Sequence, residues 1–403
     1  MANRRNAGVL FIFITILFDC IGFGIIIPIM PALIKELTGA NLSEASEYGG
    51  ILLTTYSLMM FVCSPILGAL SDKLGRRPVL LISLFGMAVD YLFLSFAHTI
   101  TLLFVGRIIA GVCGASITTA SAYIADVSTP EKRAQNFGLI GAAFGLGFII
   151  GPVIGGVFSQ FGTRVPFMIA GGLSLLNWLY GYFILPESLK KENRRAFDWK
   201  RANPVGALMQ IKRYPSLIGL LGALLILYIA VQSTQTVWAF YTQEKFGWNE
   251  TWVGYSLGFV GVMVAIVQGG LIRIIIPKIG QKKSILIGLS LYVVGFVLFA
   301  FASKGWMMFA FIVPYALAGI TGPAIQGIIS TKVKADEQGE LQGIMTSFMS
   351  LASIIGPLLM SYLFAHFTSV KTSIYFPGAP FMMGAILTCV SIAICYNNLK
   401  KHH

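Results

Sequence analysis

Residues 68–77 read Gly-Ala-Leu-Ser-Asp-Lys-Leu-Gly-Arg-Arg, and they join two long apolar runs. This stretch carries three cations, one acid and two glycines, whereas only 11% of the whole chain is charged. Gly68 and Gly75 allow a sharp turn or a close approach of the backbone. The charges can form a small ion-pair cluster whose making and breaking locks one conformation. The alternative interpretation is a basic loop that only sets the topology of a membrane protein.

The composition of the chain indicates a membrane protein. Of 403 residues, 56% are hydrophobic, and the charged share of 11% is far below the roughly 25% of soluble domains. The apolar residues form runs of about 20, the length of a membrane-spanning helix, and lipid offers the backbone no other hydrogen-bonded structure than a helix or a closed barrel. We therefore predict an all-α membrane protein with twelve transmembrane helices. The predicted spans are 7–33, 48–70, 78–96, 101–123, 137–158, 166–185, 217–241, 251–277, 284–301, 306–328, 341–364 and 375–396.

The basic residues predict the orientation of these spans. Of the 29 lysines and arginines, 23 lie at the two termini, in the loops that follow even-numbered spans or, for Arg273, near the end of such a span. Five lie in the opposite loops, and Arg107 lies well inside a span. This bias places both termini and residues 68–77 in the cytoplasm. The net charge of +13 is therefore a topology signal, and we expect no nucleic-acid partner. The first apolar run is too long for a cleavable signal peptide.

A basic linker, residues 187–214, divides the chain into an N-terminal half, 1–186, and a C-terminal half, 215–403, of six spans each. The halves look related, because Ile-Gly-Pro at 150–152 recurs at 355–357 and Gly75 with its two cations recurs as Gly-Gln-Lys at 280–282. A duplicated six-helix unit is a common construction of secondary transporters, in which substrate binds between the halves.

Two acids and one arginine lie well inside predicted spans, and all three belong to the N-terminal half: Asp19, Asp90 and Arg107. Charges within a span usually face the bundle interior or a water-filled cavity. A buried carboxylate binds protons more readily, and a nearby cation opposes that. We expect a proton-coupling role, first for Asp19 and second for Asp90. The alternative is a static ion pair that fixes helix packing.

Small residues and prolines mark two of the predicted helices. After Asp19, Pro28 and Pro31 predict a broken first helix, and the alternative is an ordinary kink. Small residues at spacings of three and four let helices approach closely. In the fifth span these are Gly147, Gly151, Pro152, Gly155 and Gly156.

A few polar and aromatic residues in the spans are candidates to line a central cavity, and each can equally serve as a helix–helix contact. They are Tyr56, Asn177, Gln232, Gln235, Trp238, Gln268 and Gln326. The five cysteines all lie in apolar runs without a CxxC pair, so we predict no disulfide and no metal site. We find no Ser-His-Asp set and no phosphate loop, and we expect neither catalytic residues nor a cofactor.

Three stretches carry a resemblance to a known family. Residues 68–77 resemble the signature between helices two and three of the major facilitator superfamily, with Lys73 where arginine is usual. Residues 107–111, Arg-Ile-Ile-Ala-Gly, resemble its helix-four arginine motif, and residues 147–156 resemble the helix-five motif of its drug/proton antiporters. Nearly the whole chain resembles the twelve-helix tetracycline exporters of bacteria. Further matching stretches are 75–81, 89–92, 144–147, 246–249, 323–327 and 341–343.

The resemblance implies a major facilitator fold of two pseudo-symmetric six-helix halves in the bacterial inner membrane. It implies a proton-coupled exporter of a small amphipathic drug-like compound, with tetracycline as the leading candidate. The partners would be that compound, protons and the lipid bilayer, and we expect a monomer. Asp19 and Asp90 would serve substrate and proton exchange, and Arg107 would tune their protonation. The cytoplasmic gate motif would comprise Gly68, Asp72, Gly75, Arg76, Arg77 and Asp126. Within it, Asp72, Arg76 and Arg77 would form a latch with Asp126 and with the start of helix eleven.

The chain departs from those exporters at two positions. Val264 and Tyr292 stand where the exporters carry a histidine and an aspartate of the proton pathway, which leaves coupling to the N-terminal half. Other functions stay open on the same fold, namely a proton-linked importer or facilitator of a metabolite, or a multidrug or siderophore exporter. Importers generally lack the helix-five motif. A receptor or scaffold is less consistent with such short loops.

Overall fold

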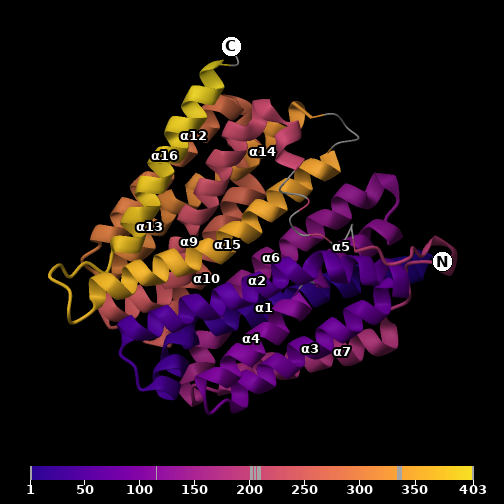
Figure 1. Ribbon diagram of the computed structural model, residues 1–403, viewed down its shortest axis with the longest axis horizontal. Helices are drawn as coiled ribbons and strands as arrows, with labels where there is room; N and C mark the ends of the chain where they lie inside the picture. Colours follow the sequence, from indigo (N-terminus) through magenta and orange to yellow (C-terminus); the bar gives the residue numbers. More distant parts are fainter. Residues whose placement is uncertain are drawn as a thin grey trace. The chain divides into compact units, whose positions relative to one another are not determined.

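The computed structural model describes residues 2–114, 116–199, 203, 206, 210–333 and 338–401. Twelve helical spans in this part of the chain are long and apolar enough to cross a membrane, which confirms the predicted all-α class. Of the predicted linker, residues 200–202, 204–205 and 207–209 lie outside the described residues. The helices (Figure 1) are α1 Ala2–Thr38, α2 Leu42–Leu74, α3 Arg76–Phe96, α4 Ile100–Gly114, α5 Ser116–Val127, α6 Pro130–Phe158, α7 Val165–Ile184, α9 Ile218–Phe246, α10 Glu250–Ile266, α11 Ile272–Ile279, α12 Gln281–Phe301, α13 Gly305–Leu317, α14 Thr321–Thr331, α15 Gln338–Thr368 and α16 Ala379–Lys401.

The fourth span comprises α4 and α5, which flank residue 115, outside the described part of the chain. Two other spans change helix geometry partway along. In the eighth span the π-helical turn Val267–Leu271 joins α10 to α11, and in the tenth the 3₁₀ turn Ala318–Ile320 joins α13 to α14. The π turn contains Gln268, Gly269 and Gly270, and glycines lower the cost of such a departure.

The expectation of a broken first helix is wrong. α1 runs through Pro28 and Pro31 as one continuous helix of 37 residues. Each proline removes only one amide donor from the helix. The close packing of α1 against α6 and α7 supports the remaining intrahelical bonds.

The chain forms two compact units. The first comprises residues 1–39, 55–204 and 250–258, and the second comprises 40–54, 205–249 and 259–403. Two short segments, the start of α2 and the start of α10, are thus grouped with the opposite half of the sequence. The core of the first unit is formed by α1, α3, α5 and α6, and that of the second by α9, α12, α14, α15 and α16.

The predicted repeat has a counterpart in the backbone. Gly75 precedes α3 with φ 107° and ψ 158°, and Gly280 precedes α12 with φ 81° and ψ 157°. Both helices have 21 residues. Positive φ with ψ near 160° is open essentially only to glycine, so the two glycines mark the same turn in the two halves of the sequence.

Candidate functional site

Two buried charges inside the spans of the first unit form an ion pair. Arg107 on α4 donates from Nη2 to Oδ2 of Asp90 on α3. Asp90 is 0% exposed and Arg107 is 4% exposed, so both charges are removed from solvent. Gly106 leaves room for this carboxylate, because a Cβ atom there would lie 2.8 Å from Asp90 Oδ1. A buried pair of this kind holds two helices together and is costly to break from one side.

Asp19 on α1 has no such cation. Among the described residues it makes no hydrogen bond or ion pair, and its side chain is half-buried. One turn before it, Thr15 donates to the amide oxygen of Asn177 on α7 at 3.4 Å. One turn after it, Gly22 packs against the phenol of Tyr91 on α3. The structure therefore pairs Arg107 with Asp90 and leaves Asp19 as an unpaired carboxylate.

The glycines of α6 hold α1 beside that carboxylate. Gly147, Gly151 and Gly155 are four residues apart, and a Cβ on each would overlap Cys20, Ile21 and Ile25 of α1 in turn. Lipid is as apolar as a protein core, so close packing of this kind is a main source of helix association in a membrane. This face of α6 fixes the part of α1 that carries Asp19.

Gly156 lies on another face of α6 and contacts the start of α10. A Cβ on Gly156 would overlap the carbonyl oxygen of Glu250, and one on Gly254 would overlap that of Pro152. The hydroxyl of Thr251 donates to the carbonyl oxygen of Gly156 at 2.9 Å. The five predicted residues of this helix thus divide between two neighbouring helices.

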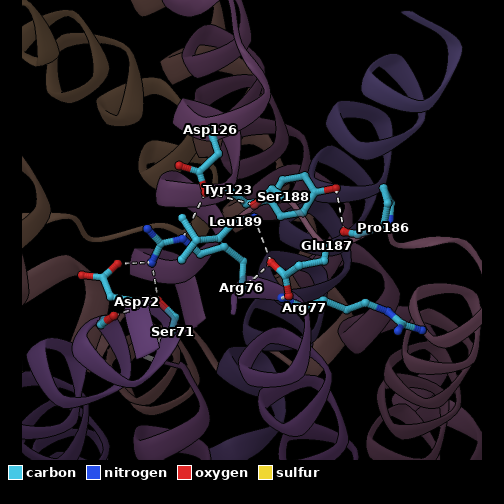
Figure 2. Close-up of polar contacts among 11 residues, drawn as sticks. Ser71, Asp72, Arg76, Arg77, Tyr123, Asp126, Pro186, Glu187, Ser188 and Leu189 are labelled. Atoms are coloured by element: carbon cyan, nitrogen blue, oxygen red, sulfur yellow. Dashed lines mark hydrogen bonds and ion pairs between the residues drawn. The ribbon is translucent and has the colours of Figure 1, made fainter. Parts of the chain in front are cut away.

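Two residues of the charged stretch and one residue at the end of α5 form a cluster, and from here on the latch means these three residues: Asp72, Arg76 and Asp126. Arg76 Nη1 lies 2.6 Å from Asp72 Oδ1, and Arg76 Nε donates to Asp126 Oδ2 at 3.2 Å (Figure 2). The Arg76 side chain is only 10% exposed. One guanidinium therefore joins the end of α2, the start of α3 and the end of α5.

The other predicted residues of this stretch have different surroundings. Arg77 Nη2 donates to the carbonyl oxygen of Tyr182 at 2.7 Å, outside the latch. Gly68 has no atom within 4 Å of the place of a Cβ, whereas a Cβ on Gly75 would collide with Glu187 and Arg194.

The predicted cavity residues divide between the two units. Trp238 is 2% exposed and packs edge-on against Phe299 and Phe381, so it lies in the aromatic core of the second unit. Gln232 is buried and donates to Ser353 at 3.0 Å. Tyr56 and Asn177 belong to the first unit, where Tyr56 contacts Phe23 and Gly114. Exposed side chains among the candidates are Gln235, Gln268 and Gln326.

One residue of the site was missed from the sequence. Glu187, directly after α7, accepts hydrogen bonds from the backbone amides of Arg76 and Arg77. It lies 111 positions from Arg76, and a lone glutamate after a proline carries no local signal of such a contact.

Comparison with known proteins identifies the family. The model of the Major Facilitator Superfamily matches residues 12–278 and 273–396, nearly the whole chain. The chain belongs to the major facilitator superfamily. It is 36% identical to the class C tetracycline resistance protein of Escherichia coli, with 96% of each chain covered. It is 34% identical to the class H protein of Pasteurella multocida, covering 98% of this chain and 97% of that one.

Solved structures of transporters share the fold. The human organic anion transporter MFSD10 (TETRAN) matches with a TM-score of 0.72 at 22% identity, covering 97% of this chain and 99% of that one. A bacterial homologue of the human lysosomal transporter Spinster, in an inward-facing and unoccupied conformation, matches with a TM-score of 0.74 at 13% identity, covering 98% and 97%. The chain is a superfamily transporter with a small-molecule substrate, not an enzyme, and its near relatives are tetracycline resistance proteins.

Val264 and Tyr292, the two residues singled out in the sequence as differing from the tetracycline exporters, lie in apolar surroundings. Tyr292 on α12 stacks on Phe296 with ring centroids 5.9 Å apart and meets Tyr315 edge-on at 5.3 Å. Val264 on α10 packs against a small cluster around Val267. Both side chains therefore contribute packing in the second unit.

Proposed function

We propose that this chain is a proton-coupled antiporter that exports a small amphipathic compound, tetracycline being the leading candidate, across the bacterial inner membrane with both termini in the cytoplasm. The observation that carries the proposal is the similarity of 34–38% over nearly the whole chain to tetracycline resistance proteins of six classes. The unpaired Asp19 and the Asp90–Arg107 pair in the first unit support it chemically.

The proposed coupling relies on competition for one carboxylate. Asp19 would carry a proton in one direction and release it when substrate binds, so that proton and substrate exclude each other. Arg107 would balance the charge of Asp90, which keeps the second carboxylate ionised and out of the exchange. A membrane potential of 100 mV contributes about 2.3 kcal/mol per transferred charge. One net charge per substrate therefore supports a concentration ratio of about 50.

The latch would act on the rate at which the transporter changes conformation. The Arg76 contacts with Asp72 and Asp126 join ends of three helices in the first unit. If the latch opens and closes in each transport cycle, its loss changes turnover, while the affinity for substrate stays the same.

The direction of flux tests the proposal against a proton-linked importer. The purified protein is reconstituted into proteoliposomes that are loaded with buffer more acidic than the outside medium, and uptake of labelled tetracycline is followed. An antiporter accumulates the compound as protons leave, whereas a symporter drives the compound out together with the protons. Accumulation in the acid-loaded vesicles supports the proposal, and loss of preloaded compound overturns it.

A second candidate is an exporter of another amphipathic drug. The apolar packing of Val264 and Tyr292, at positions where the tetracycline exporters have ionisable residues, favours it. Growth of a drug-sensitive bacterium that expresses the chain, measured against tetracyclines and unrelated antibiotics, separates the two candidates. Resistance limited to tetracyclines supports the first, and resistance limited to other drugs supports the second.

A further inference from the structure

The start of the linker is bound to the latch at several points. We name residues 186–195 the strap. Its contacts all lie within the first unit. Tyr123 donates from its phenol to the carbonyl oxygen of Pro186 at 3.2 Å, and the hydroxyl of Ser188 donates to Asp126 Oδ2 at 3.0 Å (Figure 2). The amide of Arg195 donates to the carbonyl oxygen of Asp72 at 3.0 Å.

Glu187 makes the central contact of the strap. Its Oε1 accepts from the amide of Arg76 at 2.9 Å, and its Oε2 accepts from the amide of Arg77 at 3.2 Å. These are the first two amides of α3, which have no partner inside the helix. The N-cap residue, Gly75, has no side chain to supply one. A carboxylate at this end also interacts favourably with the helix dipole.

The same residue is therefore held from two sides. The guanidinium of Arg76 reaches Asp72 and Asp126, while its backbone amide is bound by Glu187. Glu187 Oε1 also accepts from the amide of Leu189 at 3.0 Å, which fixes the carboxylate relative to the strap. Glu187, a residue of the linker, thus fixes the backbone position from which the Arg76 side chain extends.

The corresponding turn in the second unit lacks this arrangement. Gly280 has nearly the same backbone conformation as Gly75, yet no described atom lies within 4 Å of the place of its Cβ. The turn before a 21-residue helix does not by itself require a carboxylate partner. Among the described residues, a carboxylate partner of this kind is present at the first turn, where the latch is.

We propose that Glu187 is a positioning residue of the transport cycle, and that the strap is the fourth component of the latch. By capping α3, Glu187 aims Arg76 at Asp72 and Asp126, so that undocking of the linker weakens the latch. This inference rests on the proposed transport function only for its kinetic consequence. The docking itself can be tested without transport.

The docking test uses the purified full-length protein in nanodiscs and follows hydrogen exchange of peptides that contain the amides of Arg76 and Arg77. We expect about a fivefold faster exchange in Glu187→Ala, the equivalent of one lost N-cap. Glu187→Gln keeps the size of the side chain and one acceptor oxygen, so it should lie between the wild type and the alanine variant. Glu192→Gln is the matched control, because it removes an exposed carboxylate from the same strap and should leave exchange unchanged.

Limited trypsin digestion gives a second readout of the same docking. Cleavage after Arg194 and Arg195 should be several times faster in Glu187→Gln than in the wild type and in Glu192→Gln. Unchanged hydrogen exchange and unchanged cleavage in both Glu187 variants would overturn the proposal that Glu187 docks the strap to α3. An equal increase of exchange and cleavage in Glu192→Gln would also overturn it, because the effect would then come from the charge of the linker and not from the Glu187 contacts.

The kinetic test separates positioning from general damage. In proteoliposomes Glu187→Gln should lower the maximal transport rate severalfold with an unchanged KM for tetracycline, as a weakened latch predicts. A raised KM at an unchanged maximal rate would contradict the positioning role. If neither the wild type nor any variant transports tetracycline, the proposed substrate is wrong. The exchange and digestion results still decide whether Glu187 docks the strap to α3.

Discussion

The guanidinium of Arg107 on α4 is bound to the carboxylate of Asp90 on α3, and Asp19 on α1 has no cation of its own among the described residues. The two buried or half-buried acids of the first unit are therefore not equivalent. We propose that the paired Asp90 contributes to structure and that the unpaired Asp19 exchanges the proton. Two of our predictions follow from this difference.

Asp90→Asn should destabilise the protein, because it leaves Arg107 buried without a counter-charge. Breaking a buried pair from one side costs about 3–5 kcal/mol. We expect a lower melting temperature of the purified protein in detergent. In the double variant Asp90→Asn with Arg107→Gln most of this loss should be recovered, since no unpaired charge remains. A single variant as stable as the wild type would show that the pair has no structural role.

Asp19→Asn should leave the stability of the protein unchanged and abolish its gradient-driven transport. Because no partner is lost, we expect a melting temperature close to that of the wild type. Gradient-driven transport should be abolished, since an amide cannot bind and release a proton. Export at the normal rate by this variant, measured in everted membrane vesicles, would refute the coupling role of Asp19.

The two adjacent arginines provide a matched test of the latch. Arg76→Lys should slow turnover, because one ammonium group cannot reproduce the contacts of the guanidinium with Asp72 and Asp126 at once. Arg77→Lys removes the same group outside the latch and should have a small effect. Transport rates over a range of substrate concentrations would check this. Equal losses in both variants would mean that charge alone matters in this stretch.

Asp72→Ala should likewise slow turnover more than it weakens substrate binding. Its carboxylate contacts Arg76 and no predicted substrate residue. Binding measured by tetracycline fluorescence quenching, beside the transport rate, separates the two effects. An equal loss of binding would place Asp72 in the substrate site instead of the latch.

Paired glycine substitutions test the close packing of α6 on α1. Gly151→Ala should destabilise the first unit by about 1–3 kcal/mol, the usual cost of overpacking, because its Cβ would overlap Ile21 and Gly24. A Cβ at Gly145 on the same helix would have no described atom within 4 Å, so Gly145→Ala should leave the free energy of unfolding unchanged. Thermal unfolding of the two variants provides the comparison. Equal stability would argue against a packing role for Gly151.

The features that could be predicted from the sequence are those carried by a single continuous segment, such as a long apolar run that must be helical in lipid. Twelve apolar runs each had to be helical in lipid, and the described part of the chain contains twelve helical spans long enough to cross a membrane. Local patterns failed where neighbours decide the outcome. Pro28 and Pro31 do not break α1, while the changes of helix geometry lie at residues 267–271 and 318–320 instead.

Long-range contacts were the hardest to predict. The pairing of Arg107 with Asp90, and not with Asp19, depends on how α3 and α4 pack. The cap that Glu187 supplies to α3 joins residues 111 positions apart, and no periodicity in a single sequence encodes it. Similarly, Trp238 is a candidate from the sequence to line a central cavity, but its contacts with Phe299 and Phe381 place it in an aromatic core.

The most direct test of the central claim is substrate-induced proton release from proteoliposomes. Vesicles with an acidic interior and an internal pH dye are exposed to tetracycline, with the membrane voltage clamped at zero. We predict that the interior becomes more alkaline as the compound accumulates, and that Asp19→Asn shows neither change. Accumulation that persists at the same rate after the pH difference is collapsed would contradict proton-coupled export by this chain.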